Sequence, residues 1–138
     1  MLRSVLAILA GIAVLTASSF AIEAIANPLM FKLFPHAIPN RAAISHNLPA
    51  TLFQFFYTAW CIAAGGYVTA WIARKARARH AVIMGAIEVA LTLIAMWSFA
   101  GEAPLRNWIV GMVLTVPAAW CGGLLAESTF KLGKLALD

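Results

Sequence analysis

Glu88 is the residue of this chain best placed to do chemistry, because it puts a carboxyl group inside the apolar stretch Ala81–Ala100. It lies about seven residues into that stretch, or roughly 10 Å deep at the rise of an α-helix. A carboxyl group at such a depth in a membrane is costly and normally faces other helices or a water-filled cavity. Tyr67 falls at a similar depth and could donate a hydrogen bond to it. Two roles remain open for Glu88, a proton or cation relay and a protonated, hydrogen-bonded structural group.

The other residues that could do chemistry lie near the ends of the apolar stretches. Glu23 comes late in the first stretch, where it can be solvated or pair with Lys32 or Arg41. His36 and His46 lie between the first two stretches, so neither is placed to hold a haem between helices. Two histidines ten residues apart are a weak signal for zinc, and whether they bind anything stays open. We expect no metal, no cofactor and no catalytic residue.

Four apolar stretches carry these residues and decide the class of protein. They are residues 2–26, 50–73, 81–100 and 108–125. A helix needs roughly 20 apolar residues to cross a bilayer, and each stretch is about that long. Of the 138 residues, 63% are hydrophobic and only 11% are charged, so a soluble domain is excluded. The sequence predicts an all-α membrane protein, one antiparallel four-helix bundle over residues 1–138, with an outer loop at 27–49 and a weakly amphipathic cytoplasmic tail at 126–138.

The basic residues are distributed unevenly between the two sides of this bundle. Seven of them fall on the side of the termini, and they are Arg3, Arg74, Lys75, Arg77, Arg79, Lys131 and Lys134. The other side holds three, Lys32, Arg41 and Arg106. The positive-inside rule therefore predicts cytoplasmic N and C termini. The net charge of +5 fits topology and attraction to lipid headgroups, and we expect no nucleic acid as a partner.

The connection between the first two stretches is unusually apolar for a loop. Asn27 and Pro28 are expected to end the first helix, because the residue before a proline avoids the α region. The next segment, Leu29–Phe34, includes Phe31 and Phe34 and is too apolar to be solvated. We expect a short interfacial helix there, or a contact surface for a partner. Further along, Asn47 is a candidate N-cap for the second spanning helix, with Pro49 in its first turn.

Glycines in the spans predict close helix contacts. Small residues in membrane helices let neighbouring backbones approach closely. The expected packing positions are Gly11, Gly65, Gly66, Gly122 and Gly123.

Several segments of the chain resemble one group of membrane proteins. They are Glu23 late in the first span, the run Trp60 to Ala70 with its Ala-Gly-Gly-Tyr core, Ala81-Val82-Ile83-Met84-Gly85, and Pro117-Ala118-Ala119-Trp120-Cys121-Gly122-Gly123. Together they resemble a widespread family of small bacterial four-span membrane proteins without an assigned function. The resemblance covers nearly the whole chain. It implies a bacterial plasma membrane and no particular reaction.

Two classes of function are compatible with these observations. The first is a non-catalytic accessory, structural or assembly subunit of a larger membrane complex, with lipids and other membrane subunits or further copies of the chain as partners. The second is a small oligomeric proton- or cation-coupled transporter or channel that uses Glu88.

Overall fold

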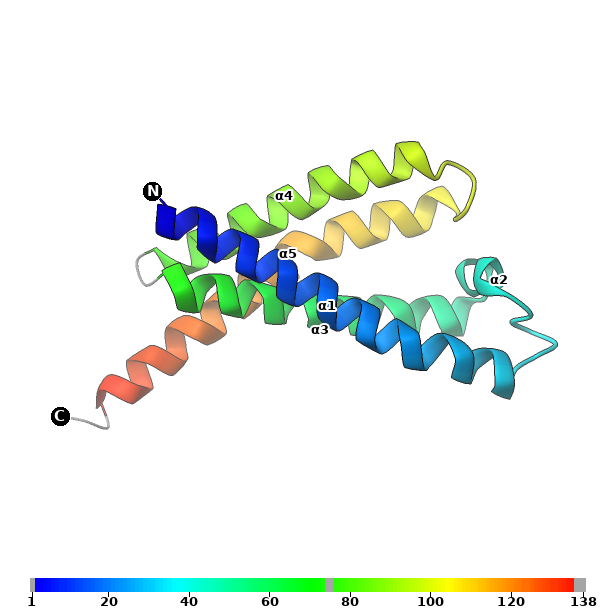
Figure 1. The fold of residues 1–138 in the computed structure, drawn as a ribbon, viewed down its shortest axis with the longest axis horizontal. Coiled ribbons are helices and arrows are strands. Elements are labelled where there is room, and N and C mark those ends of the chain that lie inside the picture. Colours follow the sequence, from blue (N-terminus) through cyan, green and yellow to red (C-terminus); the bar gives the residue numbers. More distant parts are fainter. Residues whose placement is uncertain (1, 74–75, 136–138) are drawn as a thin grey trace.

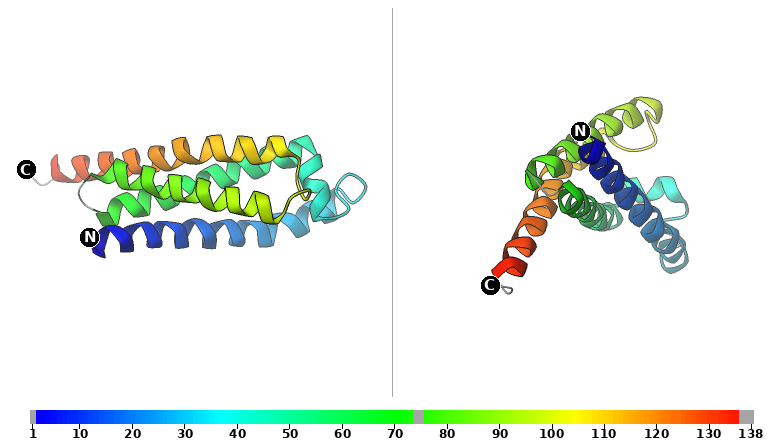
Figure 2. Two further views of the ribbon diagram at one scale, coloured as in Figure 1. Left: turned by 90° about the horizontal axis from the view of Figure 1, so that it is seen from above. Right: turned by 60° about the vertical axis from the view of Figure 1, so that its left-hand side comes forward.

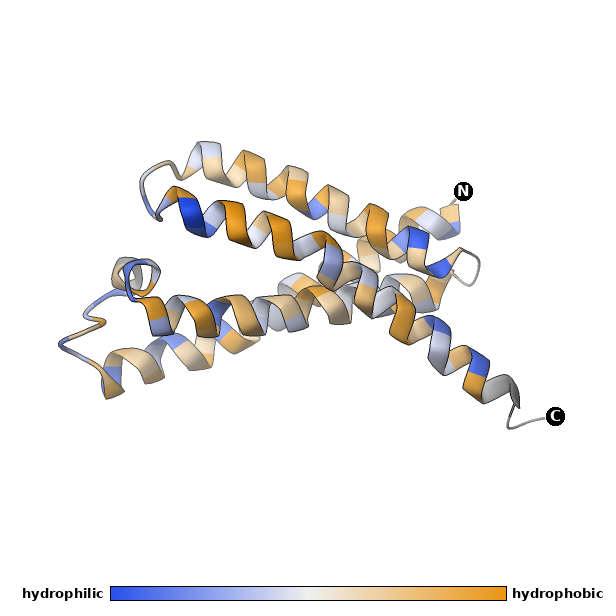
Figure 3. Ribbon diagram, turned by 180° about the vertical axis from the view of Figure 1, so that it is seen from behind, coloured by the Kyte–Doolittle hydropathy of each residue, from blue (hydrophilic) through white to orange (hydrophobic). Residues whose placement is uncertain are grey.

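The computed structural model describes residues 2–73 and 76–135, without the side chains of residues 41–42 and 133–135. Five helices make up this part of the chain. They are α1 (Leu2–Leu33), α2 (Arg41–His46), α3 (Leu48–Ala73), α4 (Arg77–Ser98) and α5 (Leu105–Leu135). The four long helices form the expected all-α bundle, and Figure 3 shows hydrophobic residues along most of their length.

Helix α3 is the centre of the bundle. It packs against α1 on one side, α5 on another, and also contacts α4 and α2. Helices α1 and α5 cross α3 at an angle, whereas α4 and α5 form an antiparallel hairpin (Figures 1 and 2). The start of α1 and the end of α5 lie at one end of the bundle, here named the terminal end, and α2 lies at the other, the α2 end. At the α2 end, the α4–α5 hairpin diverges from α1 and α3 (Figure 1).

The crossing of α1 and α3 depends on glycine. A Cβ atom added at Gly65 would lie 2.7 Å from the carbonyl oxygen of Gly11. One added at Gly11 would overlap the Thr69 hydroxyl and lie 2.7 Å from the Gly65 carbonyl oxygen. Real Cβ atoms do not approach backbone atoms this closely, so the two helices could not keep this separation with any larger residue.

The crossing of α3 and α5 also depends on glycine. A Cβ atom at Gly66 would overlap the carbonyl oxygen of Ala119, and one at Gly122 would overlap that of Ala63. Gly123 faces α4 instead, where its Cβ would lie 2.7 Å from that of Ala81. All five glycines singled out in the sequence therefore lie where one helix meets another.

Helix α1 is longer than the sequence predicts. It continues through Pro28 to Leu33, so the expected end at Asn27–Pro28 is wrong. The reason is tertiary packing, because Met30 and Phe31 lie against a buried cluster of Ile38, Ile44 and Ala50 that holds the last turns of α1 in place. The segment Leu29–Leu33 thus ends α1 rather than forming a separate interfacial helix.

The short helix of this connection is α2, at Arg41–His46. The Asn40 side chain caps it by accepting the N–H of Ala43 at 3.0 Å. Its far end is tied to α3, where the buried Thr51 hydroxyl donates to the Ile44 carbonyl at 3.0 Å. The expected cap of α3 is confirmed, because the Asn47 side chain accepts the N–H of Ala50 at 3.2 Å.

Two hydrogen bonds connect α2 to the diverging hairpin. The Asn107 side chain donates to the Ser45 carbonyl oxygen at 2.8 Å, and the Ser45 hydroxyl donates to the Glu102 carbonyl oxygen at 3.4 Å. Helix α2 therefore links the α1–α3 pair to the α4–α5 hairpin at the end where the two separate.

The helix ends near the basic residues also differ from expectation. Helix α4 already begins at Arg77, so Arg77 and Arg79 belong to its first turn rather than to a link. Arg74 and Lys75 lie outside the described residues. Helix α5 runs without a break to Leu135, so the described part of the expected tail continues the fourth spanning helix.

Replacing Gly122 by leucine should destabilise the protein by about 1–3 kcal/mol or more, since the new side chain meets the α3 backbone. Gly111, on the same helix, has open space around it, and Gly111→Leu serves as the matched control. Thermal unfolding in mild detergent measures both variants. Equal stability of the two would show that the α3–α5 contact does not depend on the missing side chain.

Candidate functional site

Three carboxyl groups belong to the membrane-crossing helices, Glu23 on α1, Glu88 on α4 and Glu127 on α5, and the first two lie farther from the helix ends than Glu127 does from the last residue of its candidate span, Leu132. Glu88 is midway between Arg77 and Ser98, about 16 Å from either end of α4. It follows the buried residues Met84 and Gly85 by one helical turn, so it lies on the face that α4 turns toward the bundle. Its side chain is partly buried.

The surroundings of Glu88 are mainly apolar toward the terminal end. Met84 belongs to a buried cluster with Leu15, Ile62 and Ala119. Among the described residues, no side chain forms a hydrogen bond or ion pair with the Glu88 carboxyl group, and the Tyr67 hydroxyl is not joined to it. The Thr92 hydroxyl donates to the backbone carbonyl of Glu88 at 2.8 Å instead. The hydrogen bond expected between Tyr67 and Glu88 is therefore not formed.

Glu23 is paired across the α1–α3 contact. The hydroxyl of Tyr57 donates to its Oε1 atom at 3.4 Å, a long hydrogen bond. Tyr57 is only 7% exposed. The ring of Phe53, one turn earlier in α3, meets the ring of Tyr57 edge-on, with centroids 5.6 Å apart. The structure thus places a carboxyl–phenol pair between two spanning helices.

Helix α1 continues beyond Glu23 to Leu33. Arg3 and Lys32 near its two ends are about 43 Å apart along the axis, which matches a bilayer of about 40–45 Å with its headgroups. Glu23 lies about 13 Å along the helix from Lys32. The expectation that Glu23 lies at the outer interface assumed a helix that ends at Asn27, whereas α1 runs to Leu33, and the depth of Glu23 in the membrane stays a prediction.

Tyr57 is the partner that sequence reasoning missed. It stood in an aromatic run with Phe53, Phe55 and Phe56, and nothing in that run distinguishes one ring from another. The pairing of Tyr57 with Glu23 depends on how α1 crosses α3 at Gly11 and Gly65, which the sequence does not reveal.

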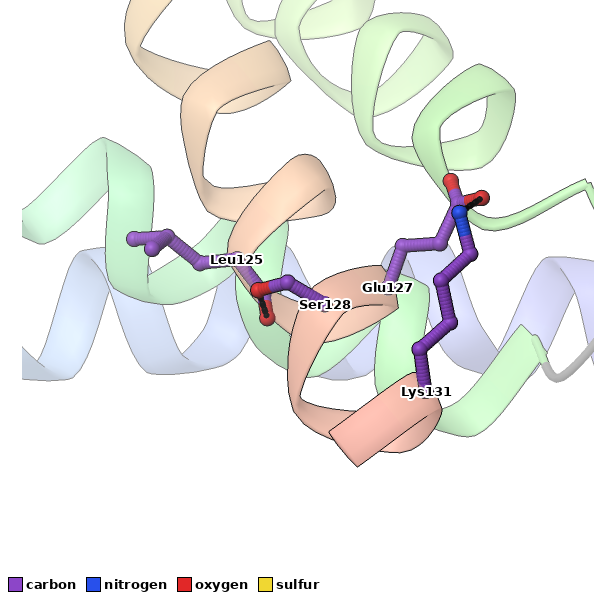
Figure 4. A network of polar contacts seen from close by, with 4 residues as sticks. All are labelled: Leu125, Glu127, Ser128 and Lys131. Atoms are coloured by element: carbon purple, nitrogen blue, oxygen red, sulfur yellow. Dashed lines mark hydrogen bonds and ion pairs between the residues drawn. The ribbon is translucent and has the colours of Figure 1, made fainter. Parts of the chain in front are cut away.

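The terminal end gathers cationic side chains. Arg3 donates from Nε to the carbonyl oxygen of Ile72 at 2.9 Å, in the last turn of α3, where a cation is favourable. The Arg77 guanidinium lies 3.6 Å from the ring centre of Phe130 on α5. Figure 4 shows the last turns of α5, where Lys131 forms an ion pair with Glu127 at 3.2 Å, and the Ser128 hydroxyl donates to the Leu125 carbonyl at 2.9 Å.

The α2 end contains an apolar pocket of about 310 Å³. Its walls come from the end of α1, the connection to α2 and the start of α3, and include Met30, Phe34, Ala37, Ile38, Pro49 and Phe53. Phe34, expected at the outer interface, is 56% exposed on this wall, while Phe31 packs into the neighbouring cluster. His36 and His46 are exposed, and nowhere in the described part of the chain do three or more His, Cys, Asp or Glu residues come together as metal ligands.

Four helices that are long and apolar enough to cross a membrane define the class, and the chain is a multi-pass integral membrane protein. Comparison with protein-family models, with curated proteins and with solved structures finds no match to the chain.

Tyr57→Phe removes the hydroxyl that binds Glu23 and should destabilise the protein by about 0.5–1.5 kcal/mol. Tyr67→Phe is the matched control, because the Tyr67 hydroxyl makes no hydrogen bond to any described residue. A double-mutant cycle with Glu23→Leu, which removes the acceptor, measured by thermal unfolding in detergent, isolates the pair. A coupling energy of zero would contradict a contribution of the Tyr57–Glu23 bond to stability.

Proposed function

We propose that this protein is a non-catalytic accessory subunit of a larger complex in a bacterial plasma membrane. It associates through the exposed face of α1 with another membrane subunit or with a second copy of itself. The observation that carries this proposal is the unusual composition of that exposed face.

The exposed middle of α1 carries a row of alanines, with the larger exposed side chain of Phe20 between them. Along one face, three to four residues apart, lie Ala13, Ala17, Ala21 and Ala24, all exposed. The exposed face of α4 carries more large residues, namely Ile83, Ile87, Leu91 and Ile94, beside the exposed Ala86 and Ala90. Large aliphatic side chains suit contact with lipid, whereas spaced small residues let a second helix approach closely, as Gly11 and Gly65 do inside the bundle.

Polar groups on the same face favour a protein partner over lipid. Thr16 lies between these alanines, is exposed, and its hydroxyl bonds to no group in the described part of the chain. Pro28 has no N–H to donate to the carbonyl of Ala24 one turn earlier. Polar groups that face hydrocarbon cost free energy unless they find a partner, and a second helix can supply one.

We also propose that the terminal end faces the cytoplasm, and the distribution of charge supports this orientation. At the terminal end, the described cationic side chains are Arg3, Arg77, Arg79 and Lys131, and the sequence adds Arg74, Lys75 and Lys134. By the positive-inside rule this end faces the cytoplasm, where anionic headgroups attract it.

Ala17→Leu should weaken the association by roughly tenfold or more, because the larger side chain holds a neighbouring helix away. Ala90→Leu, at an exposed alanine of α4, is the matched control and should leave the association unchanged. Native mass spectrometry of protein released from membranes in mild detergent measures the complexes. A wild-type protein that is monomeric and free of co-purifying protein would contradict the proposal, as would an Ala17→Leu variant that assembles normally.

A second candidate function is a proton- or cation-coupled transporter, which the position of Glu88 favours. A carboxyl group midway along a spanning helix, on its packed face, is the kind of residue such proteins use. The Glu23–Tyr57 pair supplies another ionisable group in the spans, but it is on α1 and α3 rather than beside Glu88 on α4.

Glu88→Gln separates the two functions, since it keeps size and hydrogen bonding but removes titration. For an accessory subunit, we expect the change to be tolerated in assembly of the complex and in its activity. For a transporter, the variant protein in proteoliposomes would fold normally and lose coupled flux. Flux in the wild type that disappears in Glu88→Gln would replace the subunit proposal by the transporter.

A further inference from the structure

We propose that the half of the α4–α5 hairpin nearest the α2 end is a hinged arm, and that opening of this arm gives water access to Glu88. The arm consists of residues 86–116, which follow Gly85 in α4 and precede Pro117 in α5. Its two helices share a weak point at one level, and few contacts hold its tip. The motion does not depend on a role as an accessory subunit.

Pro117 is the weak point of α5. It lies inside the helix, at an exposed position. It has no N–H to donate to the carbonyl of Val113, so α5 lacks one backbone hydrogen bond at this turn. Sharp bends in helices occur mostly at such prolines. Helix α5 therefore bends most easily at Pro117.

Gly85 is the matching weak point of α4. A Cβ atom at Gly85 would lie 2.9 Å from the Cβ of Ala119 and 3.4 Å from the Cα of Val116, so Gly85 is at the level of Pro117. Glycine is the poorest helix former after proline. Both helices of the hairpin can thus bend at the same level, as a hinge requires.

The packing of the hairpin differs on the two sides of this level. Toward the terminal end, Gly122 lies against the backbone of α3 and Gly123 against α4. Toward the α2 end, the hairpin diverges from α1 and α3 (Figure 1). Residues 97–102, at the tip of the arm, are all exposed. The terminal half of the hairpin is therefore fixed by close packing, and the arm is not.

Helix α2 holds the tip of the arm through two hydrogen bonds. Asn107 donates to the Ser45 carbonyl oxygen at 2.8 Å, and the Ser45 hydroxyl donates to the Glu102 carbonyl oxygen at 3.4 Å. Helix α2 is itself fixed to α3 by the Thr51 hydroxyl. Loss of one hydrogen bond shifts an equilibrium by roughly two- to tenfold, so contacts of this kind hold an arm closed and still allow it to open.

Glu88 lies at the base of the arm. It follows Gly85 by three residues, on the face that α4 turns toward the bundle. Thr92, one turn further, is about 10 Å along α4 from Gly85. A bend of about 20° at the hinge moves α4 by about 4 Å at Thr92, more than the width of a water molecule. Opening of the arm therefore admits water from the tip as far as Glu88.

The test measures the position of the arm in lipid nanodiscs by double electron–electron resonance. Spin labels are attached to Lys32→Cys at the end of α1 and to Ala100→Cys at the tip of the arm, both exposed positions. The native thiols are removed by Cys61→Ala and Cys121→Ala. Leu105 lies about 18 Å along α5 from Pro117, so the same bend moves it by about 6 Å.

Asn107→Ala removes the shorter of the two hydrogen bonds at the tip. We expect it to increase, by roughly two- to tenfold, a population in which the distance between the labels is about 6 Å longer. Arg106→Ala, at the exposed neighbouring position, is the matched control and should leave the distances as in the wild type.

Two further measurements locate the hinge and connect it to Glu88. Pro117→Ala restores the missing N–H, and in combination with Asn107→Ala it should reduce the longer population. A cysteine introduced by Glu88→Cys reports water access through its rate of reaction with a small water-soluble thiol reagent. That rate should rise by roughly two- to tenfold when Asn107→Ala is added.

Labels at Lys32→Cys and Ala64→Cys, both within the α1–α3 pair, provide the control for folding. Their distance should be equal in all variants. If Asn107→Ala fails this control, Asn107→Leu, which is closer in size to asparagine, takes its place.

Four results would overturn the proposal. The first is a wild-type distance distribution between positions 32 and 100 in the Asn107 variants. The second is a longer population that Pro117→Ala does not reduce. The third is an unchanged reaction rate of Glu88→Cys while the arm opens. The fourth is loss of the control distance between positions 32 and 64 in both Asn107 variants, because the contact would then hold the whole bundle rather than the arm.

Discussion

The close approach of backbones at Gly65 and Gly66 is the constraint on which the rest of the structure depends. These neighbouring glycines point to different sides of α3, so α1 meets the helix at one and α5 at the other. Lipid is as apolar as the side chains between helices, and burial of apolar surface gives little drive for helices to associate in a membrane. Dense packing must therefore supply the favourable free energy of helix association, and packing is densest where no side chain separates two backbones.

This constraint explains why the two ends of the bundle differ. Helices that cross at one tight point diverge away from it, and here the α4–α5 hairpin separates from α1 and α3 toward the α2 end. The space left by divergence is filled by α2, which is tied to α3 through Thr51 and to the hairpin through Asn107. The apolar pocket and the Glu23–Tyr57 pair both lie in this looser half of the bundle.

The proposed subunit role applies the same packing principle to the outside of the molecule. Inside the bundle, spaced small residues of α1 meet α3, and outside it, alanines of the same helix have no counterpart within the chain. A helix with small residues on two faces is suited to packing on both, whereas α4 shows the large residues expected where lipid is the neighbour. Glu88 is compatible with either functional class. A carboxyl group at this position of a membrane helix can be a structural group or part of a transport path.

The sequence by itself determined the class of protein, the four spanning helices, the cap at Asn47 and the glycine positions. These follow from local properties, namely hydropathy over about 20 residues, the hydrogen bond of a cap and the size of a side chain. Only the tertiary structure decided where α1 ends, because the packing of Met30 and Phe31 on Ile38, Ile44 and Ala50 outweighs the local effect of Pro28. The tertiary structure also decided the pairing of Glu23 with Tyr57, because that pairing depends on how α1 crosses α3. In the same way, the tertiary structure forms no hydrogen bond between Tyr67 and Glu88. Partners across helices depend on the crossing angle and rotation of the helices, which local sequence does not encode.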